Sequence, residues 1–203
     1  GTYLIVRYIQ RELGTSCRAV KAYYQAMGGF NGGTLASAFN IYNSTQVSQV
    51  SNPFLLNPTS DRSPEEIERN RDPEFPQYDP DLDTWVAPFF MGAVNTRVVR
   101  RSNALYSQWQ EPYGVDFTYQ EYLKFDPPIG WLPAVGITAA TALFIGAIQQ
   151  PPIRSLLQPL LPQPGSGPSE KTMNEGWFRC ELLGLTSDGR KVQGLICDRG
   201  DPG

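Results

Sequence analysis

Residues 85–106 read WVAPFFMGAVNTRVVRRSNALY, and this stretch predicts a helix over 89–106. Four apolar side chains recur at helical spacing and form one narrow stripe: Met91, Val94, Val98 and Leu105. Arg97 and Arg101 flank this stripe, while Arg100 points away from it. Such a basic edge beside an apolar stripe can dock an anion or a carboxylate. The alternative is that these arginines are solvated or pair with acids of the same chain.

Other segments around this helix predict a sheet. Alternating or β-rich runs indicate strands at 17–27, 115–125, 177–185 and 191–197. Helical spacing recurs at 2–13 and 34–43. The sequence therefore predicts an α+β fold, with a mixed, mostly antiparallel sheet and the helices 2–13, 34–43 and 89–106 on one face.

The last two strands predict a hairpin around Asp188-Gly189, which is a strong two-residue turn signal. With a two-residue loop, Cys180 lies opposite Cys197, and both side chains face the core. Facing cysteines here are expected to be two reduced, packed thiols.

Residues 44–84 are rich in proline and polar side chains, and predict an excursion over the surface, such as a lid. Within it, Ser63-Pro64-Glu65-Glu66 is a helix start with Ser63 as the N-cap. Asp79, Asp81 and Asp83 imitate the start of a calcium loop, but the glycine and glutamate that such a loop needs are missing. An acidic surface loop without a metal is the expectation.

An apolar insertion over 127–164 follows the second predicted strand, 115–125. No charged residue occurs between Asp126 and Arg154, and residues 129–148 read IGWLPAVGITAATALFIGAI. Twenty apolar residues can cross a hydrocarbon core of about 30 Å. Proline and small residues also permit a helix that dips into one leaflet, or a buried helix.

The amino-acid composition limits the catalytic groups and the partners that this chain can use. The chain of 203 residues has no histidine, so catalysis would rely on carboxylates, lysine, tyrosine, cysteine or a cofactor. Its net charge of −3 argues against a nucleic-acid partner, and its three cysteines argue against a secreted disulfide framework. Residues 28–33 are glycine-rich but fit neither dinucleotide-binding nor P-loop spacing. The termini suggest a fragment of a longer protein, with 1–203 forming one sheet domain.

Several stretches, taken together in order, carry a family resemblance: MGGFNGGTLAS (27–37), YDPDLDTWVAPFFMGAVNTRVVRRSNAL (78–105), GSGPSEKTMNEGWFRCELLG (165–184) and GDPG (200–203). They resemble the saccharopine dehydrogenase-like oxidoreductases, and within them the trans-acting enoyl reductases. The resemblance implies a two-domain, Rossmann-type reductase of which this chain is mostly the second domain. It implies NADP or NAD in the full-length protein and no cofactor-binding residue in this fragment, because the nucleotide fingerprint would lie upstream. It also favours contact of the apolar segment with a membrane or lipid droplet.

Two functions compete. The first is part of a nicotinamide-dependent oxidoreductase acting on a lipid-linked substrate in lipid metabolism, inside the cell, with this fragment alone inactive. Its catalytic residues are unassigned, and the candidate substrate contacts are Asn95, Arg97, Arg101 and Tyr119. The second is a non-catalytic lipid- or membrane-associated scaffold with the same fold, or a subunit whose sheet is completed by a partner chain.

Overall fold

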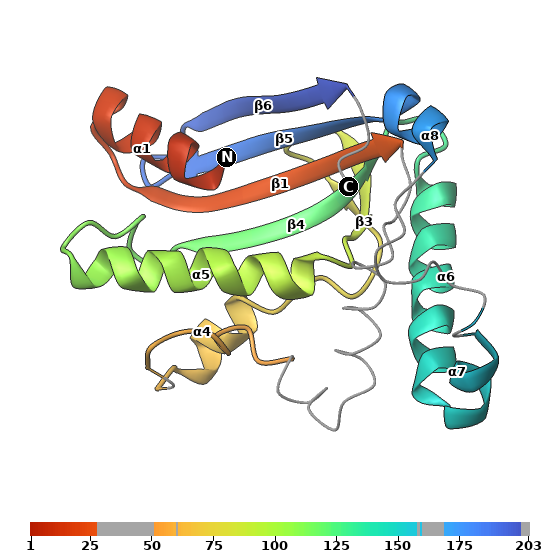
Figure 1. Cartoon of the computed structure of the whole chain (residues 1–203). Coiled ribbons are helices and arrows are strands. Elements are labelled where there is room, and N and C mark those ends of the chain that lie inside the picture. The colour runs from red at the N-terminus through yellow and green to blue at the C-terminus, as the bar shows by residue number, and fades with distance from the viewer. Residues whose placement is uncertain (28–50, 60, 158, 160–168, 200–203) are drawn as a thin grey trace.

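The computed structural model describes residues 1–27, 51–59, 61–157, 159 and 169–199. Its strands form one six-stranded sheet in the order β2-β3-β4-β1-β5-β6 (Figure 1). The strands are β1 (Cys17–Met27), β2 (Gln77–Asp79), β3 (Thr84–Pro88), β4 (Thr118–Phe125), β5 (Trp177–Thr186) and β6 (Lys191–Arg199). Only β1 and β4 pair in parallel, so the predicted mixed, mostly antiparallel sheet is confirmed. The short strands β2 and β3 were not predicted.

The helices of the described residues are α1 (Thr2–Glu12), α4 (Pro64–Arg69), α5 (Gly92–Gln108), α6 (Trp131–Gln149), α7 (Pro151–Leu157) and α8 (Glu170–Glu175). Helices α1 and α5 lie on the same face of the sheet, as predicted (Figure 1). The predicted helix 34–43 and the glycine-rich turn 28–33 lie outside the described residues. Ser63 caps α4 as expected, because its hydroxyl accepts a hydrogen bond from the Glu66 N–H at 3.2 Å.

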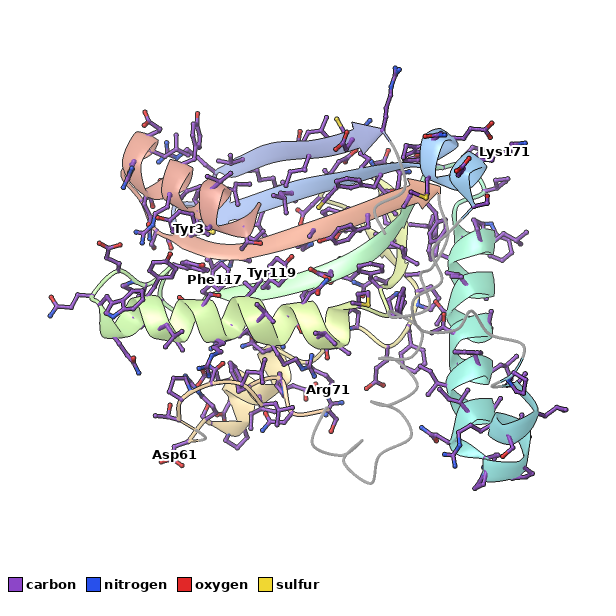
Figure 2. All side chains as sticks on the ribbon, in the orientation of Figure 1. Tyr3, Asp61, Arg71, Phe117, Tyr119 and Lys171 are labelled. Carbon is purple, nitrogen blue, oxygen red and sulfur yellow. The ribbon has the colours of Figure 1, made fainter. Side chains whose placement is uncertain are left out.

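The main core fills the layer between the sheet and these two helices. Helix α1 contributes Ile5, Val6 and Ile9, whose spacing places them on one face. Figure 2 shows Phe117 and Tyr119 between β4 and α5, where both side chains are buried. The front face of the sheet is thus closed by helices.

The opposite face carries a smaller core. Tyr23, Tyr122 and Leu183 pack there with Val86. The Lys21 ammonium binds Asp79 at 2.9 Å and Asp81 at 2.7 Å, and the Tyr23 hydroxyl donates to Asp79 at 2.8 Å. Asp79 is also buried, so the expected acidic surface loop is wrong at this position. Lys21, on the sheet, compensates the charge of the Asp79 carboxylate, which the sequence analysis expected to be solvated.

The β5–β6 hairpin differs from prediction by one residue. Thr186 N–H donates to the Arg190 carbonyl at 3.0 Å, which closes a three-residue loop, and Gly189 has φ +89°. This register pairs Cys180 with Ile196 and Arg179 with Cys197. Because a slip of one residue reverses the faces of a strand, Cys180 is buried and Cys197 is exposed. The predicted facing cysteines are wrong.

Helix α5 is rotated relative to its predicted orientation. Val94 and Val98, on the predicted apolar stripe, are exposed. Val99 and Tyr106 pack against the main core instead, and Arg100, predicted to point away, is buried. The helix is covered by the sheet on one side and by the loop from residue 51 on another, where Arg100 donates to the carbonyl of Pro53. The loop is distant from α5 in the sequence, so the spacing of residues within the helix does not reveal this contact.

Helix α6 starts beside β3 and runs away from the sheet, with α7 against its far end (Figure 1). It is long and apolar enough to cross a membrane, with a mean hydropathy of 1.8, yet only 11% of that window is buried. Leu143, near its middle, is 75% exposed. Within the described residues α6 is therefore not a buried core helix, and contact with a membrane stays a prediction.

Candidate functional site

A buried carboxylate lies at the centre of the layer between β4 and α5. Glu121 is only 2% exposed. Its carboxylate accepts hydrogen bonds from the hydroxyl of Tyr119 at 2.7 Å, the amide of Asn95 at 2.9 Å and the hydroxyl of Tyr24 at 3.3 Å. We call Glu121, Tyr119, Asn95 and Tyr24 the Glu121 cluster. It brings together Asn95 and Tyr119, two of the predicted substrate contacts.

The electrostatics of the cluster follow from burial. Burial raises the pKa of Glu121, while hydrogen bonds from Tyr119 and Asn95 oppose that shift. Burial and the neighbouring Glu121 charge raise the pKa of both Tyr119 and Tyr24. The two hydroxyls therefore stay protonated at neutral pH and act as donors to the carboxylate.

Tyr24 is the more accessible of the two tyrosines of the cluster, because it is half-buried whereas Tyr119 is buried. Its ring stacks on Phe89 at 4.7 Å between centroids. Tyr24 pairs across the sheet with Cys180, whose thiol pKa is raised to about 11 by burial. One hydrogen bond thus links the buried carboxylate to the half-buried Tyr24.

Arg97 belongs to a second cluster of polar side chains, together with Asp72 and Arg100. Its guanidinium pairs with Asp72, which lies in the loop between α4 and β2. Arg100 approaches the same carboxylate at 3.6 Å and donates to the carbonyl of Tyr119 at 3.1 Å. Burial lowers the pKa of Arg100 to about 10, although attraction from Asp72 opposes this. Arg97 is thus engaged inside the fold.

Arg101, the remaining predicted contact, points elsewhere. Its side chain is exposed and donates to the backbone carbonyl of Leu56. The four predicted residues therefore do not form one site: Asn95 and Tyr119 meet at Glu121, Arg97 binds Asp72, and Arg101 lies on the surface. Their role in substrate binding stays a prediction.

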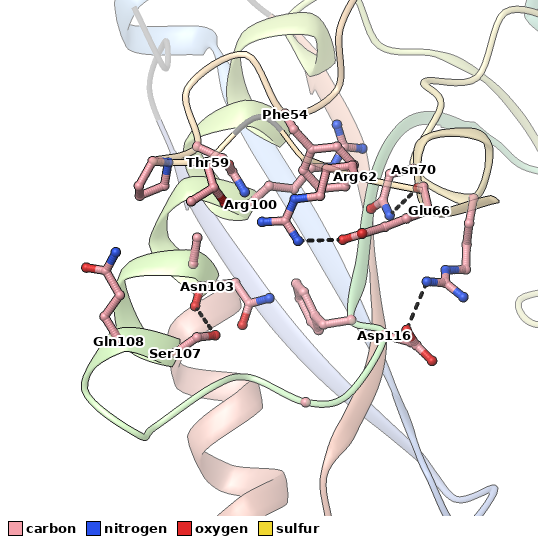
Figure 3. Close-up of a pocket in the computed structure, with 16 residues that line it drawn as sticks. Phe54, Thr59, Arg62, Glu66, Asn70, Arg100, Asn103, Ser107, Gln108 and Asp116 are labelled. Atoms are coloured by element: carbon pink, nitrogen blue, oxygen red, sulfur yellow. Dashed lines mark hydrogen bonds and ion pairs between the residues drawn. The ribbon is translucent and has the colours of Figure 1, made fainter. Parts of the chain in front are cut away.

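A polar pocket of about 470 Å³ opens between α4 and the second half of α5 (Figure 3). We call it the α4–α5 pocket. Its walls come from the loop 53–59, from 62–70, from the second half of α5 and from the loop before β4. Two ion pairs border it, Arg62–Glu66 at 2.7 Å and Arg69–Asp116 at 2.9 Å. This volume is typical of small-molecule sites.

Sequence reasoning missed Glu121, Tyr24 and Asp72. For Glu121 a signal existed: it shares the inward parity of Phe117, Tyr119 and Leu123 on a strand that is otherwise apolar on that side. An acid at an inward position must be paired or hydrogen-bonded. Asp72 gave no local signal, because its partners are distant in the sequence.

The fold and its site define an α+β domain with a six-stranded mixed sheet and a buried carboxylate cluster. The chain is homologous to proteins named trans-acting enoyl reductase. It is 32% identical over 191 residues to a Mycobacterium tuberculosis protein provisionally given that name, covering 87% of this chain and 44% of that protein. The trans-acting enoyl reductase of Mycobacterium ulcerans is 35% identical over 161 residues, covering 70% of this chain and 35% of that protein. The trans-acting enoyl reductase of Mycobacterium leprae is 30% identical over 165 residues, covering 75% of this chain and 37% of that protein.

The chain thus spans less than half the length of these relatives. No family model matches the chain, and no solved structure matches it significantly.

Proposed function

We propose that this chain is the substrate-side part of a nicotinamide-dependent enoyl reductase of the saccharopine dehydrogenase-like type, acting on a lipid-linked substrate inside the cell. The names of the homologues support the reaction class. Each of these relatives extends well beyond the matched region, which leaves length for a Rossmann-type nucleotide-binding domain. A bound nicotinamide would supply the hydride, and we assign none of its contacts to this chain.

The proposal of a lipid-linked substrate rests on the exposure of α6. A helix that is apolar on all sides belongs in a core or in lipid. This helix projects from the sheet with only 11% of its most apolar window buried. Helix α7 adds exposed Ile153 and Leu156 next to it. We propose that α6 and α7 contact a membrane or lipid-droplet surface and bring the domain to substrates held there.

Flotation of the full-length protein with phosphatidylcholine liposomes tests this contact. Leu143→Asp places a charge on α6, and Val115→Asp places one on an equally exposed apolar residue before β4. A charge inside the hydrocarbon costs about 3 kcal/mol, so Leu143→Asp should weaken binding by about a hundredfold. Val115→Asp should float like the wild type. Equal flotation of wild type and Leu143→Asp would refute contact through α6.

Oxidation of NADPH by the full-length protein tests the reaction. A long-chain 2-enoyl thioester embedded in liposomes should be reduced, and Leu143→Asp should slow this reaction. A short, soluble 2-enoyl thioester should be reduced equally by both proteins, because it needs no membrane contact.

A non-catalytic lipid-associated scaffold is the second candidate, since exposure of α6 by itself demands no reductase chemistry. A protein that floats with liposomes but oxidises no NADPH with either thioester would favour the scaffold over the reductase.

A further inference from the structure

The α4–α5 pocket has unused hydrogen-bonding capacity. Four buried side-chain atoms that lack a partner in the described part of the chain belong to residues lining it. They are Nε of Arg62, Nε of Arg100, Oδ1 of Asn57 and Oδ1 of Asn70. Arg100 is 3% exposed and Asn70 is 2% exposed. Buried polar groups are normally satisfied, and a group of them around one cavity indicates a site built for a polar ligand.

The charges around the pocket are already compensated. Arg62 pairs with Glu66 at 2.7 Å, and Arg69 pairs with Asp116 at 2.9 Å. The guanidinium of Arg100 lies 3.6 Å from Asp72, and its two Nη atoms are hydrogen-bonded to backbone carbonyls. The described residues that line the pocket therefore offer no uncompensated cation to a phosphate or carboxylate.

The remaining capacity is two N–H donors and two carbonyl acceptors. A hydroxyl group matches both, because it accepts one hydrogen bond and donates another. An anion offers acceptors only and would leave both asparagine oxygens unsatisfied. The rings of Phe54 and Phe117 form an apolar part of the wall, against which C–H groups can pack.

We propose that the α4–α5 pocket binds a neutral polyhydroxylated ligand of hexose size, with its hydroxyls bridging Arg62 and Arg100 to Asn57 and Asn70 (Figure 3). The ligand is either a free sugar or the headgroup of a glycolipid. We assign no cofactor contact to this pocket. The proposed ligand is independent of the proposed reductase activity.

Titration with methyl α-D-glucopyranoside, followed by ¹H–¹⁵N NMR of the full chain, tests the site. The Nε–H signals of Arg62 and Arg100 and the side-chain amide signals of Asn57 and Asn70 should shift and saturate together. Inorganic phosphate at the same concentrations should not shift them. Octyl glucoside binding more tightly than the methyl glucoside would identify a glycolipid headgroup, whereas equal binding would identify a free sugar.

Two variants remove one hydrogen bond each. Arg62→Lys keeps the charge beside Glu66 but loses Nε, and Asn57→Leu keeps the shape but loses the acceptor. Each should weaken glucoside binding by about tenfold. The control is Arg71→Lys, on an exposed arginine that pairs with Glu68 outside the pocket. Two results would overturn the proposal: no saturable shift in the folded wild-type protein, or unchanged binding by both pocket variants with wild-type melting temperatures.

Discussion

Arg97 and Asp72 form an ion pair in which the arginine side chain is 3% exposed and the aspartate 27%. The pair joins α5 to the loop between α4 and β2, two segments separated in sequence by β2 and β3. Removal of one partner from such a pair leaves the other charge buried and uncompensated, which is costly.

We therefore expect Asp72→Ala to lower the free energy of unfolding by about 3 kcal/mol, because Arg97 and Arg100 would face each other without an acid. Arg97→Ala should cost a similar amount. Arg101→Ala, on the exposed side of the same helix, should cost less than about 0.5 kcal/mol. Urea denaturation measures all three. Equal losses for Arg97→Ala and Arg101→Ala would show that Arg97 is not buried.

Glu121 should make stability depend on pH. Burial raises the pKa of the folded carboxyl above its ordinary value of 4.5. Between the two values the folded state binds more protons than the unfolded state, so the free energy of unfolding falls as pH rises through this window. This contribution is fully present below pH 4.5 and is lost as pH rises through the folded pKa.

Glu121→Gln should remove that decline, since the amide does not titrate and still accepts from the hydroxyl of Tyr119. Unfolding by urea between pH 4 and pH 8 gives the slope for each protein. Glu68→Gln, on an exposed acid of α4, is the control. A Glu121→Gln slope equal to that of the wild type would contradict a shifted carboxyl.

Only one of the three cysteines should react rapidly in the native protein. Cys197 is exposed, whereas Cys17 and Cys180 are buried. Burial raises the pKa of Cys17 to about 12 and that of Cys180 to about 11, so few thiolates form at these positions. A chromogenic disulfide reagent should modify one thiol quickly and three in denaturant. Slow reaction of Cys197, or a disulfide between Cys180 and Cys197 under mild oxidation, would support the two-residue hairpin loop instead.

Gly114→Ala should destabilise the fold. A β-carbon at this position would lie 1.9 Å from the backbone carbonyl oxygen of Cys17, which cannot move without breaking the start of β1. Such overpacking costs about 1–3 kcal/mol or more. At Gly194, on β6, the nearest atom would be 3.7 Å away, so Gly194→Ala should be tolerated. Melting temperatures compare the two, and an unchanged value for Gly114→Ala would contradict this close approach.

Local patterns predicted much of this fold, because α1, β1, the cap of α4 and the β5–β6 strands depend on neighbouring residues. The hairpin register was wrong because Asp188-Gly189 suits both a two-residue and a three-residue loop, and only the cross-strand contacts choose between them. The face of α5 was wrong because Arg100 is buried through partners that come from other segments. In the site, Asn95 and Tyr119 were found, but Glu121, which holds them together, was passed over.

The position of β1 in the sheet has a consequence for how the protein is made. Ala19 pairs with Thr118 on one side and with Leu185 on the other, so the central strand finds both neighbours only late in synthesis. Long-range pairing of this kind slows folding. Until β5 leaves the ribosome, one edge of β1 stays unpaired while the apolar α6 segment is already present, which favours aggregation. Production of this chain should therefore benefit from slow expression and from chaperones that shield nascent strands.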